Sequence, residues 1–302
     1  MRDLTPDVHE PLPAPASVLG ESPLWHPVEQ ALYWCDIAGF ALNRFDPASG
    51  QHAHWSFATE VASCAAMRDG GMLLAMRDGL WRFDTRTGER TPLAAAPYDT
   101  ALERFNDGKC DPQGRFWVGT IYEPRKPALA ALYCFSGGTL QRVADDVTVS
   151  NGLAWSLDGR TMYWSDTTSH TVFAMDFDGA SGRPGPRRVF ARFPLKQPEQ
   201  ELATYGGRPD GAAVDSEGAY WSAMFEGQRL LRLSPAGEVL AELALPVRCA
   251  TMPCFGGADL KTLYVTTSRE KRPADELAQQ PLAGRVLAFR VDVAGLPATL
   301  FG

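Results

Sequence analysis

Four short segments of the sequence place an acid or an amide directly before an apolar run, and these side chains are candidates for metal chemistry. They are Glu21 in Gly-Glu-Ser-Pro, Asn106 in Arg-Phe-Asn-Asp-Gly, Asn151 in Ser-Asn-Gly-Leu and Asp210 in Arg-Pro-Asp-Gly. Carboxylate and amide oxygens are hard ligands that suit a divalent cation. Each segment alone is also an ordinary turn sequence or a surface acid. The fold must therefore decide whether they meet.

The elements that carry these segments are predicted to be strands, because helical periodicity is almost absent from the sequence. Short apolar runs alternate with Gly, Asp and Pro, which is typical of an all-β protein. One unit recurs six times: an aromatic-rich strand, a polar spacer and a second strand. These pairs are residues 31–36 with 42–46, 71–75 with 80–84, 114–118 with 131–135, 161–165 with 172–176, 218–222 with 230–233, and 261–265 with 285–289.

The spacing of the six units predicts a six-bladed β-propeller. Between the equivalent positions 34, 74, 117, 164, 221 and 265 the intervals are 40, 43, 47, 57 and 44 residues, a period typical of propeller blades. A pair of two-sheet sandwiches fits this near-equal spacing less well. We expect residues 1–17 to form an N-terminal arm and residues 18–302 a single propeller domain. Insertions at 178–188 and 194–206 are interpreted as surface loops, the second as a candidate lid.

A propeller would bring the four polar segments together. Strands that line the central channel come from every blade, so residues at equivalent strand starts converge at one mouth of that channel. Two carboxylates and two amides there would form an oxygen-rich site for a divalent cation. Their recurrence in register favours a site over four unrelated turns.

Composition and motifs exclude several other classes of protein. The net charge is −7, and Lys and Arg are scattered, so no nucleic-acid partner is expected. The six cysteines show neither a C-x-x-C pair nor zinc spacing, which favours reduced thiols in a cytoplasmic protein. Residues 1–17 contain four prolines and no apolar core, so neither a secretory signal nor a membrane span is expected. The sequence contains no Gly-x-Ser-x-Gly nucleophile elbow, no His-Glu-x-x-His zinc motif and no Walker A phosphate-binding loop. His52 and His54 are interpreted as a solvated pair in a polar turn.

The motifs together resemble the senescence marker protein 30 / gluconolactonase / regucalcin-like family of six-bladed propellers. The resemblance spans nearly the whole chain and also includes Cys-Phe-Gly-Gly at 254–257. It implies that Glu21, Asn151 and Asp210 hold one divalent cation, for which calcium, zinc, manganese, magnesium and iron are all candidates. It implies that Arg104 and Asn106 line the substrate site. In the family an acid shortly after the Gly-Thr pair at 119–120 also helps to bind substrate. Glu123 corresponds to this acid, although Pro124 follows it where a second acid can occur.

The resemblance implies a lactonase that opens a sugar lactone to the aldonic acid. Asp210 is the candidate catalytic base, because a ligand carboxylate would lie beside the attacking water. No covalent nucleophile is then needed, which suits the absence of a Ser or Cys elbow. Two alternatives remain. One is a calcium-binding regulatory protein without important turnover, and the other is a propeller hydrolase of aryl esters or organophosphates.

Overall fold

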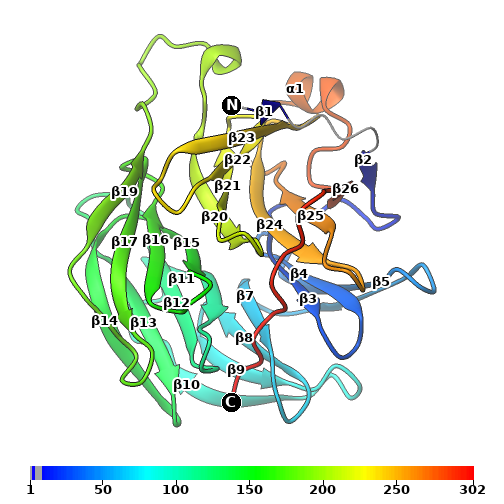
Figure 1. Cartoon of the computed structure of the whole chain (residues 1–302). Coiled ribbons are helices and arrows are strands. Elements are labelled where there is room, and N and C mark those ends of the chain that lie inside the picture. Colours follow the sequence, from blue (N-terminus) through cyan, green and yellow to red (C-terminus); the bar gives the residue numbers. More distant parts are fainter. Residues whose placement is uncertain (1, 4–8) are drawn as a thin grey trace.

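The computed structural model describes residues 2–3 and 9–302, and its strands form six sheets arranged around a central channel (Figure 1). This confirms the predicted all-β six-bladed propeller. In each blade the first strand lines the channel and the following strands lie progressively further out. Radial closure of this kind leaves only short strand edges.

The first three blades contain four strands each. They are β3 (Gly20–His26), β4 (Ala31–Asp36), β5 (Ala41–Asp46) and β6 (Gln51–Ser56); β7 (Val61–Ala66), β8 (Met72–Met76), β9 (Gly79–Phe83) and β10 (Arg90–Ala95); and β11 (Glu103–Cys110), β12 (Phe116–Tyr122), β13 (Ala130–Ser136) and β14 (Thr139–Val147). The predicted strand pairs correspond to the second and third strands of the blades.

The last three blades carry the additions to this plan. Their strands are β15 (Ser150–Trp155), β16 (Thr161–Asp166), β17 (Thr171–Asp178), β18 (Arg183–Pro184) and β19 (Arg188–Arg192); β20 (Arg208–Val214), β21 (Tyr220–Phe225), β22 (Arg229–Leu233) and β23 (Val239–Ala244); and β24 (Ala250–Gly256), β25 (Thr262–Thr267) and β26 (Leu287–Arg290). A 3-10 turn, η1 (Leu202–Thr204), and a helix, α1 (Ala274–Gln279), lie in connections.

The N-terminal segment contributes the outermost strands of two blades. β2 (His9–Pro11) pairs antiparallel with β26 and completes the sixth blade, while β1 (Arg2–Asp3) pairs parallel with β23 of the fifth. Residues 1 and 4–8 of the predicted arm lie outside the described residues. The C-terminal tail crosses the face seen in Figure 1, where Phe301 bridges to Met67 of the second blade. Both ends of the chain therefore tie blades together.

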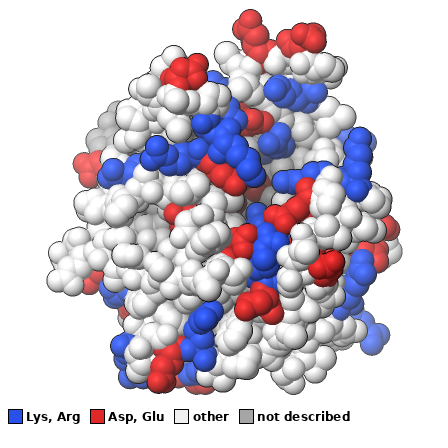
Figure 2. Space-filling view, turned by 180° about the vertical axis from the view of Figure 1, so that it is seen from behind, with Lys and Arg blue, Asp and Glu red and all other residues white. Residues whose placement is uncertain are grey.

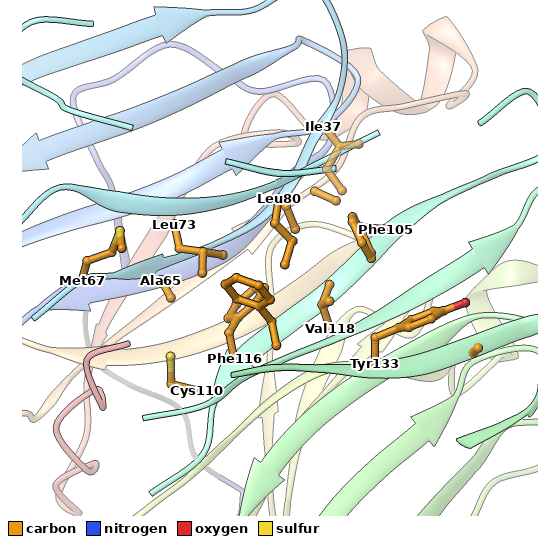
Figure 3. Close-up of a cluster of buried hydrophobic side chains, with 14 residues drawn as sticks. Ile37, Ala65, Met67, Leu73, Leu80, Phe105, Cys110, Phe116, Val118 and Tyr133 are labelled. Carbon is orange, nitrogen blue, oxygen red and sulfur yellow. The ribbon is translucent and has the colours of Figure 1, made fainter. Parts of the chain in front are cut away.

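The core lies between neighbouring blades. Trp34, Trp117, Trp164 and Trp221, the four tryptophans used to set the repeat, are all at most 1% exposed. Figure 3 shows the cluster between the second and third blades, where Phe105 lies near Val118 and Tyr133. Phe105 also contacts Tyr98 edge-on, with ring centroids 5.1 Å apart. Burial of Phe105 fixes the strand that carries its polar neighbours, Arg104 and Asn106.

A buried aspartate closes the turn before the second strand in the third and fifth blades. The Asp111 carboxylate accepts hydrogen bonds from the Trp117 indole (2.9 Å) and from Arg115 Nε (2.6 Å). Asp215 does the same for the Trp221 indole (2.8 Å) and for Arg232 Nε (2.7 Å). Each carboxylate also caps two backbone N–H groups of its own turn. Both carboxyl side chains are fully buried.

We expect Asp111→Ala to lower the free energy of unfolding by about 3 to 5 kcal/mol, because it leaves a buried guanidinium without its partner. Urea unfolding measures this loss. Asp158→Ala is the matched control, since Asp158 stands in the corresponding turn of the fourth blade and is exposed. Its loss should stay below about 1 kcal/mol. Equal losses in the two variants would contradict a special role for the buried carboxylate.

The two insertions take different forms. Residues 178–188 contain β18, and residues 194–206 form the loop that carries η1 and projects from the propeller in Figure 1. His170 anchors this second loop at both ends: Nδ1 lies 2.8 Å from the Pro194 carbonyl oxygen, and Nε2 lies 3.0 Å from the Tyr205 hydroxyl.

Two further expectations concern cysteines and membranes. All six cysteines are free thiols, four of them buried. In the part of the chain that the structure describes, no helix is both long and apolar enough to cross a bilayer.

Candidate functional site

The predicted site residues lie where the inner strands are bulged. All six inner strands show a register shift near their start. In β3, β11, β15 and β20, two residues oppose one residue of the next strand. Glu21 and Asn151 directly precede the bulged pair, and Asn106 and Asp210 belong to it. Bulges redirect side chains and are frequent beside active sites.

Gly152 shows why the bulge in β15 needs its particular sequence. Its φ is +63°, and an added Cβ would lie 2.4 Å from the Tyr220 hydroxyl and 2.7 Å from Ser165 Oγ. Only glycine satisfies both the backbone and the packing. The Asn-Gly pair that resembles a simple turn therefore serves to hold Asn151 in a crowded strand.

A chain of hydrogen bonds links three blades at this end of the channel. Arg104 Nη1 donates to Asn106 Oδ1 (2.8 Å), and Asn106 Nδ2 donates to Asn151 Oδ1 (2.9 Å). Asn151 Nδ2 donates to Thr167 Oγ1 (2.8 Å), and this hydroxyl donates to the Pro209 carbonyl oxygen (2.8 Å). The residue after Pro209 is Asp210, so the chain connects β11 and β15 to the candidate base.

Three buried carboxylates share the same region. Glu21, Asp107 and Asp210 are 8%, 3% and 6% exposed. Burial raises the pKa of each carboxyl. The negative charges of Asp210 and Asp107 raise the pKa of Glu21 further. The pKa of Asp210 is about 8, because burial and the charge of Asp107 raise it more than the nearby arginines lower it. These mutual effects show that the three groups lie close enough to repel one another.

The carboxylates have few hydrogen-bond donors. Glu21 accepts only the adjacent Ser22 N–H (3.2 Å), and the Asp210 carboxylate accepts none from the described residues. Asp107 Oδ2 accepts the Leu153 N–H (2.9 Å), but its buried Oδ1 has no partner in that part of the chain. Buried acids without donors are costly unless a cation or a proton neutralises them. The donor set therefore fits a divalent cation.

Glu21, Asn151 and Asp210 are the residues that would hold such a cation. Within residues 2–3 and 9–302 no group of three or more His, Cys, Asp or Glu side chains has the arrangement of a metal site. The predicted set therefore includes an amide, and Asn151 Oδ1 is the oxygen that would complete it. This oxygen already accepts one hydrogen bond from Asn106 and retains a second lone pair.

Arg104 is a half-buried cation beside these acids. Burial lowers its pKa, while the charges of Glu123, Glu60 and Glu21 raise it. Its Nη1 also donates to the Phe105 carbonyl oxygen (2.8 Å), so its orientation is fixed by two neutral acceptors. Its remaining donors have no partner among the described residues and are available to a ligand.

Glu123 lies at the rim and is bound by another residue. Its carboxylate receives Arg77 Nη1 (3.1 Å) and Nη2 (3.0 Å), and its side chain is 41% exposed. Arg77 also pairs with Glu60 through Nε (2.8 Å). Among the described residues, the Glu123 carboxylate is hydrogen-bonded to Arg77 and not to the other predicted site residues, and it affects the site through its charge on Arg104.

Three residues of the site had no assigned role in the sequence. Asp107 and Lys109 follow Asn106 in the segment at 104–109, where Asn-Asp-Gly is also a turn sequence. Lys109 Nζ instead donates to the Ala212 carbonyl oxygen inside the channel (2.5 Å). Thr167 belongs to no motif. In the sequence, Thr167 could be noticed only because it lies three residues after Trp164, the tryptophan of the fourth repeat.

The opposite end of the channel has a different character. A cavity of about 340 Å³ there is lined by the ends of the inner strands, including Cys110 and Phe255, and by the tail residues Leu296 and Thr299. Figure 2 shows the other face of the molecule, where basic and acidic side chains surround a central hollow. The polar site and the apolar cavity therefore occupy opposite ends of the same channel.

Sequence and fold both resemble known proteins. The family model described as "SMP-30/Gluconolactonase/LRE-like region" matches residues 19–269. The chain is 45% identical over 296 residues to a Pseudomonas putida protein named 6-deoxy-6-sulfogluconolactonase, covering 94% of this chain and 95% of that protein. It is 35% identical over 287 residues to regucalcin of Gallus gallus, covering 92% and 93% of the two chains.

A solved structure of regucalcin from Agrobacterium tumefaciens, described as a calcium-binding protein, superposes with a TM-score of 0.92. It is 27% identical to this chain, and the match covers 100% of both chains. The likeness therefore extends over the whole propeller.

Proposed function

This chain belongs to the SMP-30/gluconolactonase/LRE-like family, and we propose that it is a lactonase that hydrolyses a sugar lactone with the help of one divalent cation held by Glu21, Asn151 and Asp210. The observation that carries this proposal is the meeting of buried, donor-poor carboxylates with a fixed Arg104 and Asn106 at one end of the channel. The relatives named for lactones support the reaction. The predicted cytoplasmic location stays a prediction.

Arg104 and Asn106 would orient the lactone. The free guanidinium donors of Arg104 suit the carbonyl oxygen or ring hydroxyls of a sugar lactone. Asn106 is hydrogen-bonded to both Arg104 and Asn151, so it fixes the position of the guanidinium relative to the proposed ligand Asn151. Donors preorganised toward developing negative charge stabilise the transition state of acyl transfer.

Asp210 would move the proton. Water adds to the lactone carbonyl carbon and gives its proton to the Asp210 carboxylate; the bond to the ring oxygen then breaks, and the ring oxygen takes the proton as a hydroxyl. A bound divalent cation would supply charge that polarises the carbonyl and acidifies water. The nearby thiols offer no competing nucleophile, because burial raises the pKa of Cys254 to about 11.

The alternatives have specific support. Relatives named regucalcin keep open a calcium-binding regulatory role. A propeller esterase or phosphotriesterase shares the fold, although the polar lining here suits a hydroxylated substrate better than an apolar ester. The Pseudomonas putida relative is named for a sulfonated lactone, which adds charged lactones to the candidate substrates.

A substrate panel tests the proposal. The full chain is treated with chelator, reloaded with each divalent cation, and assayed on aldonolactones, aryl acetates and a phosphotriester, with spontaneous hydrolysis subtracted. We expect saturable turnover of the lactones and higher kcat/KM for them than for the apolar esters. A preference for aryl esters or phosphotriesters would contradict the proposal. Cation binding without turnover of any substrate would favour the regulatory role.

A further inference from the structure

Arg125 stands on the rim of the site in a backbone conformation that is unusual for its residue type. Its φ is +67°, and its N–H donates to the Tyr122 carbonyl oxygen (2.9 Å) in the turn that follows β12. β12 pairs with the site strand β11, with Ile121 opposite Arg104. A residue with a long side chain seldom adopts positive φ, so the tight turn fixes the direction in which the chain leaves β12. The turn thus holds Arg125 beside the end of β11 that carries the candidate site.

The Arg125 guanidinium has no partner of its own. Its side chain makes no ion pair or hydrogen bond with any part of the chain that the structure describes. The charges that face it are those of Arg208, Glu123, Glu270 and Asp210. Partial burial and, after it, the positive charge of Arg208 lower its pKa.

The three carboxylates near Arg125 are already engaged. Glu123 is bound by Arg77, with Oε1 3.0 Å from Nη2. Glu270 Oε1 lies 3.1 Å from Lys271 Nζ. Asp210 belongs to the proposed cation set. None of the three is therefore free to neutralise Arg125.

Arg208 is the second guanidinium, and its position is fixed. It lies two residues before Asp210 on β20, and its guanidinium carbon lies 5.0 Å from the centroid of the Phe225 ring. Its Nη1 is 3.0 Å from Glu226 Oε2, but Arg272 Nη1 takes the other oxygen of the same carboxylate at 2.8 Å. Arg272 also pairs with Glu276 (2.6 Å), which Arg248 contacts as well (3.4 Å), so two acids serve three arginines and the group keeps excess positive charge.

We propose that Arg125 and Arg208 form an anion subsite beside the catalytic end of the channel, so that the preferred substrate is a lactone bearing an anionic group. This inference rests on the proposed lactonase function and names its substrate class. Arg125 follows β12 and Arg208 begins β20 at the same end of the channel, and the two positive charges repel each other. A sulfonate, phosphate or carboxylate bound by both guanidiniums would relieve that repulsion. Planar guanidinium donors match the oxygens of all three anions.

The test compares lactones that differ only in charge. Glucono-1,5-lactone and its 6-sulfo-6-deoxy and 6-phospho counterparts are assayed at fixed ionic strength with the wild type, Arg125→Ala and Arg125→Lys. Arg86→Ala is the matched control, because Arg86 is an exposed arginine in a turn of the second blade at the opposite end of the propeller. Arg208 is not varied, because its charge acts on Asp210 more strongly than that of Arg125 and it lies only two residues from Asp210 on β20.

We expect the wild type to prefer a charged lactone by at least about tenfold in kcat/KM. Arg125→Ala should lower kcat/KM for the charged lactones by about 10- to 100-fold, mainly through KM, as expected for one lost charged hydrogen bond. The neutral lactone should change by no more than about twofold. Arg125→Lys should recover part of the loss, and Arg86→Ala should match the wild type.

Other outcomes overturn the inference in distinguishable ways. Equal or better hydrolysis of the neutral lactone by the wild type, or an equal loss on all lactones in Arg125→Ala, would overturn the anion subsite alone. Turnover of no lactone would overturn the proposed function. Calorimetric titration with glucose 6-phosphate and uncharged glucose would then decide whether the subsite binds anions, and equal affinities would exclude it. Comparison of the sulfo and phospho arms identifies which anion is preferred.

Discussion

Asp210→Asn is expected to lose nearly all lactone hydrolysis, by about 10²- to 10⁴-fold in kcat even at saturating divalent cation. The amide keeps the shape of the side chain but cannot accept a proton from water, and it removes one negative charge from the proposed ligand set. Asp210 is suited to be the base because its carboxylate accepts no hydrogen bond from the described residues and, as a proposed ligand, it would lie beside the attacking water. Initial rates and bound metal per chain are measured on the same preparation.

Arg104→Ala provides the contrast to this variant. A cationic side chain cannot bind a cation, so bound metal should equal that of the wild type. The lost charged hydrogen bond should lower kcat/KM by roughly 30- to 200-fold. The division of roles would be wrong if Arg104→Ala lost its metal, or if metal-loaded Asp210→Asn kept most of its activity.

The second and third strands of each blade were predictable because they are buried on both faces. Trp164 and its neighbours in β16 are an apolar run with a turn on each side, and five of the six residues in that strand are buried. The outermost strands gave a weaker signal, since β6 alternates between exposed and half-buried polar residues. His52 and His54 therefore lie on β6 and not in the predicted turn, although they do form a pair: their rings stack at 6.1 Å, and His54 is exposed while the half-buried His52 also stacks on Trp34 at 5.6 Å.

Closure of the ring could not be read from the sequence. β2 carries only His-Glu-Pro, and its partner β26 lies at the other end of the chain. Pairing across such a distance depends on the completed propeller rather than on local propensity. The bounds of a predicted arm therefore carry no information about which blade it joins.

The site was predictable in its motifs but not in its contacts. Glu21, Asn151 and Asp210 were singled out because turn-like segments recur in register and match the motifs of the family, and their role as ligands stays a prediction. Asp107 was missed as a site residue because Asn-Asp-Gly is also a good turn sequence, and only the bulge in β11 shows that its carboxylate is buried. The proposed role of Arg125 rests on the geometry of its turn and on the lack of a hydrogen-bonding partner among the described residues. Neither feature can be recognised in a single sequence.

Removal of the divalent cation is expected to abolish lactone hydrolysis, and its return should restore the activity. Without the cation, Glu21, Asp107 and Asp210 remain buried side by side with few donors. Exhaustive chelation followed by stepwise addition of each metal measures the effect. Glu21→Gln should need more metal for the same rate, because it removes one ligand charge. Glu238→Gln, at an exposed turn, is the matched control. Full activity in stripped protein would contradict a cation requirement.

The stability of the stripped protein gives an independent readout of the same cation. The folded-state pKa of Asp210 is raised from its ordinary value of 3.8 to about 8, and that of Glu21 is raised as well. The folded protein therefore binds more protons than the unfolded chain between about pH 4 and 8, so its stability should fall as the pH rises through this range. Cation binding requires the ionised carboxylates. We accordingly expect added cation to raise Tm more at pH 8 than at pH 5 in the wild type, and less in Glu21→Gln than in Glu238→Gln. An equal rise in Tm at the two pH values would show that the cation binds somewhere other than at these acids.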